Sequence, residues 1–160
     1  MAEDTPEHIS AISDAQRPQV QIHCQVDLSL LGLLRDFVNN AARHFGFNET
    51  SVAEIELSVD EACANVVEHA YGLDAKRPEN AIILVEVTYS DPQLMVRISD
   101  SGRGAVMDNM GSKNLEHYLE PDRDHYRGLG IIMMKKFMDH VDIRSGTPAG
   151  TVVTMIKMRR

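Results

Sequence analysis

Residues 56–72, ELSVDEACANVVEHAYG, carry the pattern that most restricts the fold of this 160-residue chain. Apolar side chains recur there at three- and four-residue steps, which predicts an amphipathic helix with one stripe facing a core. Glu61 and Asn65 are four positions apart, so a helix projects both from one neighbouring face. A carboxylate can accept a proton and an amide oxygen can bind Mg²⁺, so the pair is compatible with catalysis. It is also compatible with a plain solvated helix edge. The apolar stripe consists of Ile55, Val59, Ala62, Val66 and Ala70.

The charge of the chain excludes several classes of partner. The net charge is −8, and no basic stripe is present to neutralise phosphates, so no nucleic-acid partner is expected. A basic protein partner suits this charge better. No apolar run is long enough to cross a bilayer, and the N-terminus lacks the apolar core of a signal peptide, so a cytoplasmic protein is expected. Cys24 and Cys63 form no C-x-x-C pair and are expected to be buried free thiols.

The length is sufficient for one domain with a hydrophobic core. Residues 1–18 are polar and acidic, which predicts a flexible leader, and a single domain is expected over residues 19–160. Consecutive hairpins favour antiparallel pairing, and three helices with single apolar stripes favour one covered face of a sheet. The predicted fold is an α/β (α+β) two-layer sandwich with a mostly antiparallel sheet. Helices are expected at residues 28–47, 51–72 and 130–140, and strands at 20–26, 81–89, 94–99, 141–145 and 151–158.

The start of the second helix has two candidate caps. Thr50 or Ser51 can accept a hydrogen bond from a free N–H group of the first turn, and Glu54 would complete a capping box with Ser51. Gly46 is the expected stop of the preceding helix.

A first glycine motif, Asp100-Ser101-Gly102-Arg103-Gly104, follows a predicted strand at once. A carboxylate at Asp100 can accept a hydrogen bond from an exocyclic amine such as that of adenine. Gly102 and Gly104 allow the backbone to approach a ligand closely. An ordinary turn has the same pattern. The stretch from Gly102 to Arg127 has no sustained period, which indicates a lid or binding loop.

Two further glycine motifs lie downstream. Arg127-Gly128-Leu129-Gly130 immediately precedes a predicted helix, and the amide groups at a helix start bind anions. A glycine-rich start of an ordinary helix is the alternative. Gly150-Thr151 opens the last predicted strand, where the threonine hydroxyl can assist a ligand or simply satisfy β-propensity.

Together these segments resemble the GHKL, or Bergerat-fold, ATP-binding domain shared by gyrase, heat-shock chaperone ATPases, histidine kinases and MutL. Across roughly residues 20–158 the chain carries, in this order, the patterns E-x-x-x-N and D-x-G-x-G, a lid, and the patterns G-x-G and G-T. Within this group the chain is most similar to bacterial anti-sigma-factor serine kinases, in its DEACANVVEHAY and GLGIIMMKKFMDHVDI runs.

The resemblance implies a role for each motif residue. Asn65 would bind Mg²⁺, and Glu61 would be the catalytic carboxylate that helps a serine hydroxyl attack the γ-phosphate of ATP. Asp100 would bind the adenine amino group, with Thr151 nearby. Arg127 would face the phosphates and stabilise the transferring group, or be a solvated lid arginine. The other cofactor-binding positions would be Gly102, Gly104, Gly128, Leu129 and Gly130.

The same resemblance implies two protein partners. Such kinases hold a sigma factor away from RNA polymerase and phosphorylate a serine on a small antagonist protein; a homodimer is compatible with this class. A nucleotide-binding module that sequesters a partner without phosphoryl transfer is the second interpretation. Glu61 favours the enzyme, whereas the unfamiliar lid permits the module. An ATPase or metal-binding protein is the third, although the seven histidines show no tight ligand spacing. A sensor histidine kinase is not expected, because no residues remain for a dimerisation helix pair.

Overall fold

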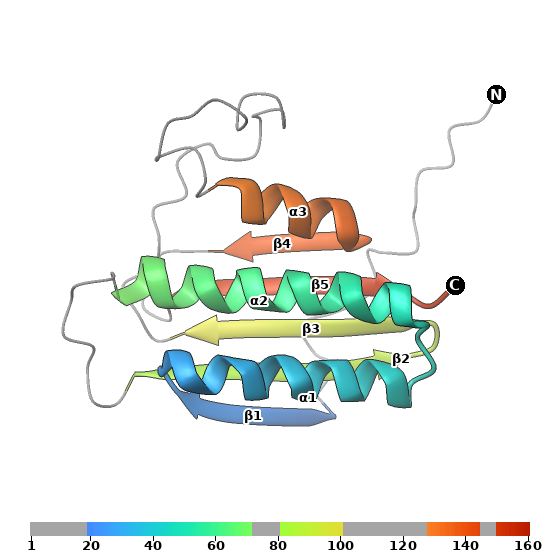
Figure 1. The fold of residues 1–160 in the computed structure, drawn as a ribbon, viewed down its shortest axis with the longest axis horizontal. Helices are drawn as coiled ribbons and strands as arrows, with labels where there is room; N and C mark the ends of the chain where they lie inside the picture. The colour runs from blue at the N-terminus through green and yellow to red at the C-terminus, as the bar shows by residue number, and fades with distance from the viewer. Residues whose placement is uncertain (1–18, 72–80, 101–127, 145–149) are drawn as a thin grey trace.

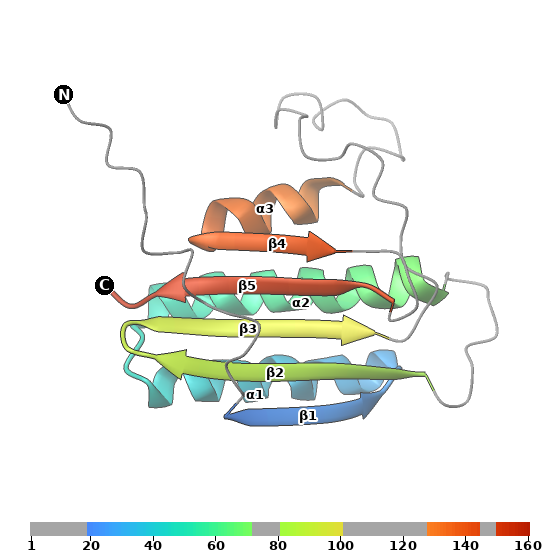
Figure 2. The ribbon, with the colours of Figure 1, turned by 180° about the vertical axis from the view of Figure 1, so that it is seen from behind.

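The computed structural model describes residues 19–71, 81–100, 128–144 and 150–160 (Figure 1). These residues form three α-helices and one five-stranded antiparallel sheet. All three helices lie on one face of the sheet, as the two opposite views agree (Figures 1 and 2). The predicted two-layer α+β architecture is therefore confirmed. In chain order the elements are β1 (Val20–Gln25), a 3-10 turn (Leu28–Leu30), α1 (Leu31–His44), α2 (Glu49–Tyr71), β2 (Ile82–Ser90), β3 (Gln93–Asp100), α3 (Leu129–Phe137), β4 (His140–Arg144) and β5 (Val152–Met158).

The strand order β1-β2-β3-β5-β4 places the last strand inside the sheet. Both predicted hairpins are present, β2 with β3 and β4 with β5. The pairing of Ser99 with Val152 brings the end of β3 beside the start of β5. Two segments that are about fifty positions apart in sequence therefore meet at one end of the sheet. The predicted leader (1–18) and lid (102–127) lie outside the described residues.

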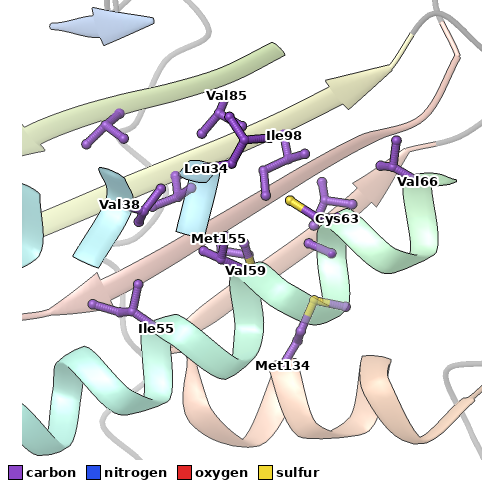
Figure 3. Packing of buried hydrophobic residues seen from close by; sticks show 14 of the residues in the cluster. Leu34, Val38, Ile55, Val59, Cys63, Val66, Val85, Ile98, Met134 and Met155 are labelled. Carbon is purple, nitrogen blue, oxygen red and sulfur yellow. The ribbon is translucent and has the colours of Figure 1, made fainter. Parts of the chain in front are cut away.

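The hydrophobic core lies between the sheet and the helices. Of the predicted α2 stripe, Ile55, Val59 and Ala62 are fully buried and Val66 is 2% exposed, which confirms which face turns inward. Burying a side chain as large as that of Val59 or Ile55 contributes about 1.5–3 kcal/mol. Figure 3 shows this stripe meeting side chains of α1, α3 and the sheet. The labelled contacts include Leu34 and Val38 of α1, Met134 of α3, and Val85, Ile98 and Met155 of the sheet.

The first helix is shorter than predicted. Asp27 Oδ1 accepts hydrogen bonds from the backbone N–H and the hydroxyl of Ser29, each 2.8 Å long. This local bonding favours a turn, and the α-helix begins only at Leu31. At the other end the helix stops at His44, and Gly46 has a φ of 82°, so the predicted stop is confirmed.

The second helix is capped by a residue that the sequence pattern did not select. Asn48 Oδ1 accepts a 2.8 Å hydrogen bond from the backbone N–H of Ser51, which is the bond of an N-cap to the third helical residue. The expectation that Thr50 or Ser51 caps the helix is therefore wrong. Ser51 lies inside the first turn, where it donates the bond.

None of the described helices is both long and apolar enough to cross a membrane. The longest, α2, has 23 residues but carries acidic side chains along its length. Its apolar stripe packs on the sheet, and of its acidic residues Glu49 is exposed while Glu54, Glu56, Asp60 and Glu61 are half-buried.

Candidate nucleotide site

Several predicted motif residues converge on one end of the sandwich. The end of β3, the start of β5, the C-terminal half of α2 and the start of α3 all lie there, at the left in Figure 1. α3 lies beside α2 and runs in the opposite direction (Figure 1). The sheet end therefore contributes Asp100 and Thr151, and the helices contribute Glu61, Asn65 and Gly130.

Asp100 is the last residue of β3, and its side chain faces the helices. The residue is only 4% exposed. Its backbone N–H donates a 3.1 Å hydrogen bond to the carbonyl of Thr151, and the N–H of Thr151 donates a 3.2 Å bond to Asp100 Oδ2. A hydrogen bond to a carboxylate is stronger than one between neutral groups. The two backbones therefore hold the carboxyl group of Asp100 in one orientation.

Gly150 leaves the space that this carboxyl group occupies. Its φ is 80°, in the region that favours glycine. A Cβ atom there would lie 2.2 Å from the carbonyl oxygen of Asp100 and 2.5 Å from Asp100 Oδ1. Gly150 is thus a functional residue that the sequence motifs alone do not assign a role of its own. The available signal was a glycine directly before the first residues of a strand.

Glu61 and Asn65 lie one turn apart on α2, and both are half-buried. The Glu61 carboxyl group lies against the first turn of α3, because a Cβ atom on Gly130 would be 2.1 Å from Glu61 Oε2. Gly128 is the buried N-cap of α3, with a helical backbone (φ −87°), and Leu129 is the half-buried first residue. The structure thus brings Glu61 and the G-x-G motif together.

Three predicted site residues lie outside the part of the chain that the structure describes. They are Gly102, Gly104 and Arg127. Their assigned roles, in the pocket and in stabilising the transferring phosphoryl group, therefore stay predictions.

Cys63 lies two positions after Glu61 but offers no nucleophile. It is 1% exposed, as predicted, whereas Cys24 is only half-buried. Burial, with a smaller contribution from the charge of Asp60, raises the pKa of the Cys63 thiol to about 12. The thiol is therefore protonated at neutral pH, and the thiolate is the reactive form.

Among the described residues, no group of three or more His, Cys, Asp or Glu side chains is arranged to hold a metal ion. A fully protein-ligated metal site is thus not found in this part of the chain. Mg²⁺ commonly takes one or two protein oxygens and fills its other positions with water and phosphate oxygens. The amide of Asn65 beside the carboxylate of Glu61 fits that donor chemistry.

The fold and this site define a histidine kinase-like ATPase domain. Residues 24–157 match the model of that family, so the chain belongs to it. Membership in this ATPase family implies ATP binding.

Two curated relatives illustrate where the chain falls within the family. It is 35% identical over 106 residues to the anti-sigma F factor of Pasteuria penetrans, covering 66% of this chain and 67% of the relative. It is 26% identical over 131 residues to the serine-protein kinase RsbW of Bacillus subtilis, covering 79% and 77%. The homologues of this chain are thus anti-sigma factors and serine-protein kinases at modest identity.

Solved structures support the same fold. The RsbU and RsbW domains of a Mycobacterium tuberculosis protein align with a TM-score of 0.58 and 16% identity, over 89% of this chain. This chain spans about a third of that longer chain, 33%. A chain of the SiaB–SiaC complex of Pseudomonas aeruginosa aligns with a TM-score of 0.56 and 11% identity, over 89% of this chain and 89% of the matched chain. At these identities the likeness concerns the fold alone.

Proposed function

We propose that this chain is a protein serine kinase of the anti-sigma-factor type. It would bind Mg²⁺ and ATP, sequester a sigma factor, and transfer the γ-phosphate to a serine of an antagonist protein. Family membership and the relatives' names, anti-sigma F factor and serine-protein kinase, support this proposal. The observation that carries it is a pair of carboxyl groups in different environments at one end of the fold. Asp100 is buried and held by backbone N–H bonding, whereas Glu61 is half-buried on α2.

Asp100 would select adenine. The carboxyl group is already oriented by the N–H of Thr151, so little ordering remains when a nucleotide arrives. An amino group on the base can donate to a carboxylate oxygen, whereas a carbonyl group at that position cannot. The expected preference is therefore for adenine over guanine nucleotides.

Glu61 would act as the general base. Its carboxylate would accept the proton of the serine hydroxyl while the serine oxygen forms a bond to the γ-phosphorus. The bond between that phosphorus and the β,γ-bridging oxygen would break, and ADP would leave. Asn65 would hold Mg²⁺, which when bound neutralises charge on the phosphate oxygens. Arg127 would add positive charge beside the transferring group.

The partners follow from the proposed class. A chain with a net charge of −8 attracts partners that present basic surfaces, which raises the rate of encounter. A sigma factor and an antagonist protein are the proposed partners, and a homodimer is the proposed assembly. The activity would take place in the cytoplasm, where ATP and sigma factors are present.

A phosphoryl-transfer assay tests the proposal. The purified chain is incubated with Mg²⁺, γ-labelled ATP and candidate antagonist proteins from the same genome, and phosphoserine is identified by mass spectrometry. Glu61→Gln should lower the transfer rate by about 10²–10⁴-fold, the usual contribution of a general base, with little change in ATP affinity. Glu56→Gln is the matched control, because Glu56 lies on the same helix but bonds to Asn39 of α1.

The alternative is a nucleotide-binding module that sequesters its partner without transfer. Nucleotide-dependent binding of a sigma factor with no labelled product from any candidate antagonist would favour the module and contradict the kinase.

A further inference from the structure

Gly130 lies in the first turn of α3, where this helix contacts α2. It is buried, and the three heavy atoms nearest to an added Cβ atom all belong to the side chain of Glu61. A Cβ atom at this position would lie 2.1 Å from Oε2, 3.0 Å from Cδ and 3.4 Å from Cγ of Glu61. The carboxyl group of Glu61 therefore occupies the space that a side chain at position 130 would need.

The backbone of Gly130 does not itself require glycine. The residue lies within α3, and its φ is outside the left-handed region in which other residues are strained. Alanine adopts helical geometry more readily than glycine does. The backbone conformation thus does not call for a glycine here, whereas the position of the Glu61 carboxyl group favours one.

A second contact sets where α3 lies along α2. Lys157 of β5 donates a 2.5 Å hydrogen bond from Nζ to the carbonyl of Phe137, the last residue of α3, and forms an ion pair with Glu54 of α2. Seven positions separate Gly130 from Phe137, and seven separate Glu54 from Glu61. Seven helical residues span about 10 Å on either helix. Because the two helices are antiparallel, fixing Phe137 beside Glu54 brings Gly130 to Glu61.

We infer that Gly130 is a positioning residue for Glu61. Its lack of a side chain lets the carboxylate lie against the first turn of α3. The contacts of Lys157 with Phe137 and Glu54 hold α3 at the position along α2 that brings Gly130 beside Glu61. The inference rests on the proposed kinase function, in which Glu61 is the general base. It gives Gly130 a role that differs from the predicted contact with phosphate groups.

The two roles of Gly130 predict different kinetics. A methyl group at this position must displace the end of the Glu61 side chain, which is flexible and can rotate away. The fold should therefore survive, and the change should appear in the position of the base. A glycine needed for close approach of phosphate would instead lose nucleotide affinity when a methyl group is added.

The test is Gly130→Ala in the full chain, with Gly32→Ala as the control. At Gly32, in α1, the nearest atom to an added Cβ is Arg35 Nη2 at 3.8 Å, an ordinary contact. Gly130→Ala should lower kcat at least tenfold, because displacement of a catalytic group by about 1 Å can cost 10²-fold. The Kd for ATP should stay within about threefold and the thermal midpoint should not fall. Gly32→Ala should leave kcat unchanged.

A double-mutant cycle completes the kinetic test. Gly130→Ala combined with Glu61→Gln should be no slower than Glu61→Gln alone, because both changes remove the same group from its working position. Additive losses, an unchanged kcat in Gly130→Ala, or a loss of ATP affinity as large as the loss of kcat would each overturn the inference.

A structural readout separates this inference from the proposed function. The ¹³C chemical shift of the Glu61 carboxyl group is measured by NMR in the wild-type chain and in the two variants. It should change in Gly130→Ala and match the wild-type value in Gly32→Ala. If the wild-type chain binds ATP but transfers no phosphate, the kinase proposal fails. A moved Glu61 signal would then still support positioning of this side chain by Gly130, and an unmoved signal would overturn it.

Discussion

Lys157 of β5 and Glu54 of α2 form an ion pair although 103 positions separate them in the sequence. The Lys157 side chain is 9% exposed and that of Glu54 is 31% exposed. The Lys157 ammonium group also donates to the carbonyl of Phe137 at the C-terminal end of α3, where the helix dipole favours a positive charge. One lysine therefore joins an interior strand to both helices that contribute to the candidate site.

Replacing Lys157 by methionine should destabilise the fold by roughly 1–3 kcal/mol. The carbonyl of Phe137 loses its donor and Glu54 loses its partner, although the partial exposure of Glu54 lets water compensate for some of the loss. The free energy of unfolding, measured in urea, checks this value. Lys136→Met, at an exposed position of α3, is the control and should change the stability by less than about 0.5 kcal/mol. Equal effects of the two changes would contradict a special role for Lys157.

ATP should stabilise the wild-type chain against heat. At a nucleotide concentration of a hundred times Kd the gain is about 2.7 kcal/mol. For a domain of this size the midpoint should rise by roughly 5–10 °C. In Asp100→Asn most of this rise should be absent, because the buried carboxylate that would accept from adenine is lost. Differential scanning fluorimetry with ATP, ADP and GTP measures the effect. A full shift in Asp100→Asn would rule out Asp100 as the adenine-binding residue.

Gly150→Ala should behave differently from Gly130→Ala. At Gly150 the φ of 80° strains any other residue, and the nearest atom to an added Cβ is a backbone oxygen, that of Asp100 at 2.2 Å. The backbone cannot move aside as a flexible side chain can. We expect a loss of about 1–3 kcal/mol of stability together with weaker ATP binding. Urea unfolding and calorimetric titration measure the two quantities, and a variant that matches wild type in both would refute this account.

Cys63 should make the stability fall at alkaline pH. Burial is the main cause that raises the folded-state pKa of the thiol from its ordinary value of 9.0 to about 12. Between these values the unfolded chain loses the thiol proton while the folded chain keeps it, so the folded state loses stability as the pH rises. The contribution is fully present below pH 9.0 and falls by at most about 1.4 kcal/mol per pH unit above it.

Comparison with Cys63→Ala isolates this contribution from other groups that titrate in the same range. The variant should show a shallower fall in unfolding free energy between pH 9 and 11, whatever its stability at pH 7. Identical slopes in the two proteins would show that the Cys63 thiol does not carry the effect.

Most of the helices and strands could be predicted from the sequence, because their signals are local. The three- and four-residue spacing of Ile55, Val59 and Ala62 directly reports a helix with one buried face. The cap of the same helix could not be predicted, since Asn48, Thr50 and Ser51 all have side chains that can cap. Only the position of the backbone in the fold selects Asn48.

The sequence by itself determined the residue types, the order of the motifs and the spacing of Glu61 and Asn65 on one helix, because a helix has a fixed local geometry. The tertiary structure decided which groups meet. Thr151 binds the Asp100 carboxylate because β5 inserts beside β3. Gly130 makes room for Glu61 because α3 packs antiparallel to α2. Such contacts depend on strand order and on packing across the whole core, which no local periodicity records.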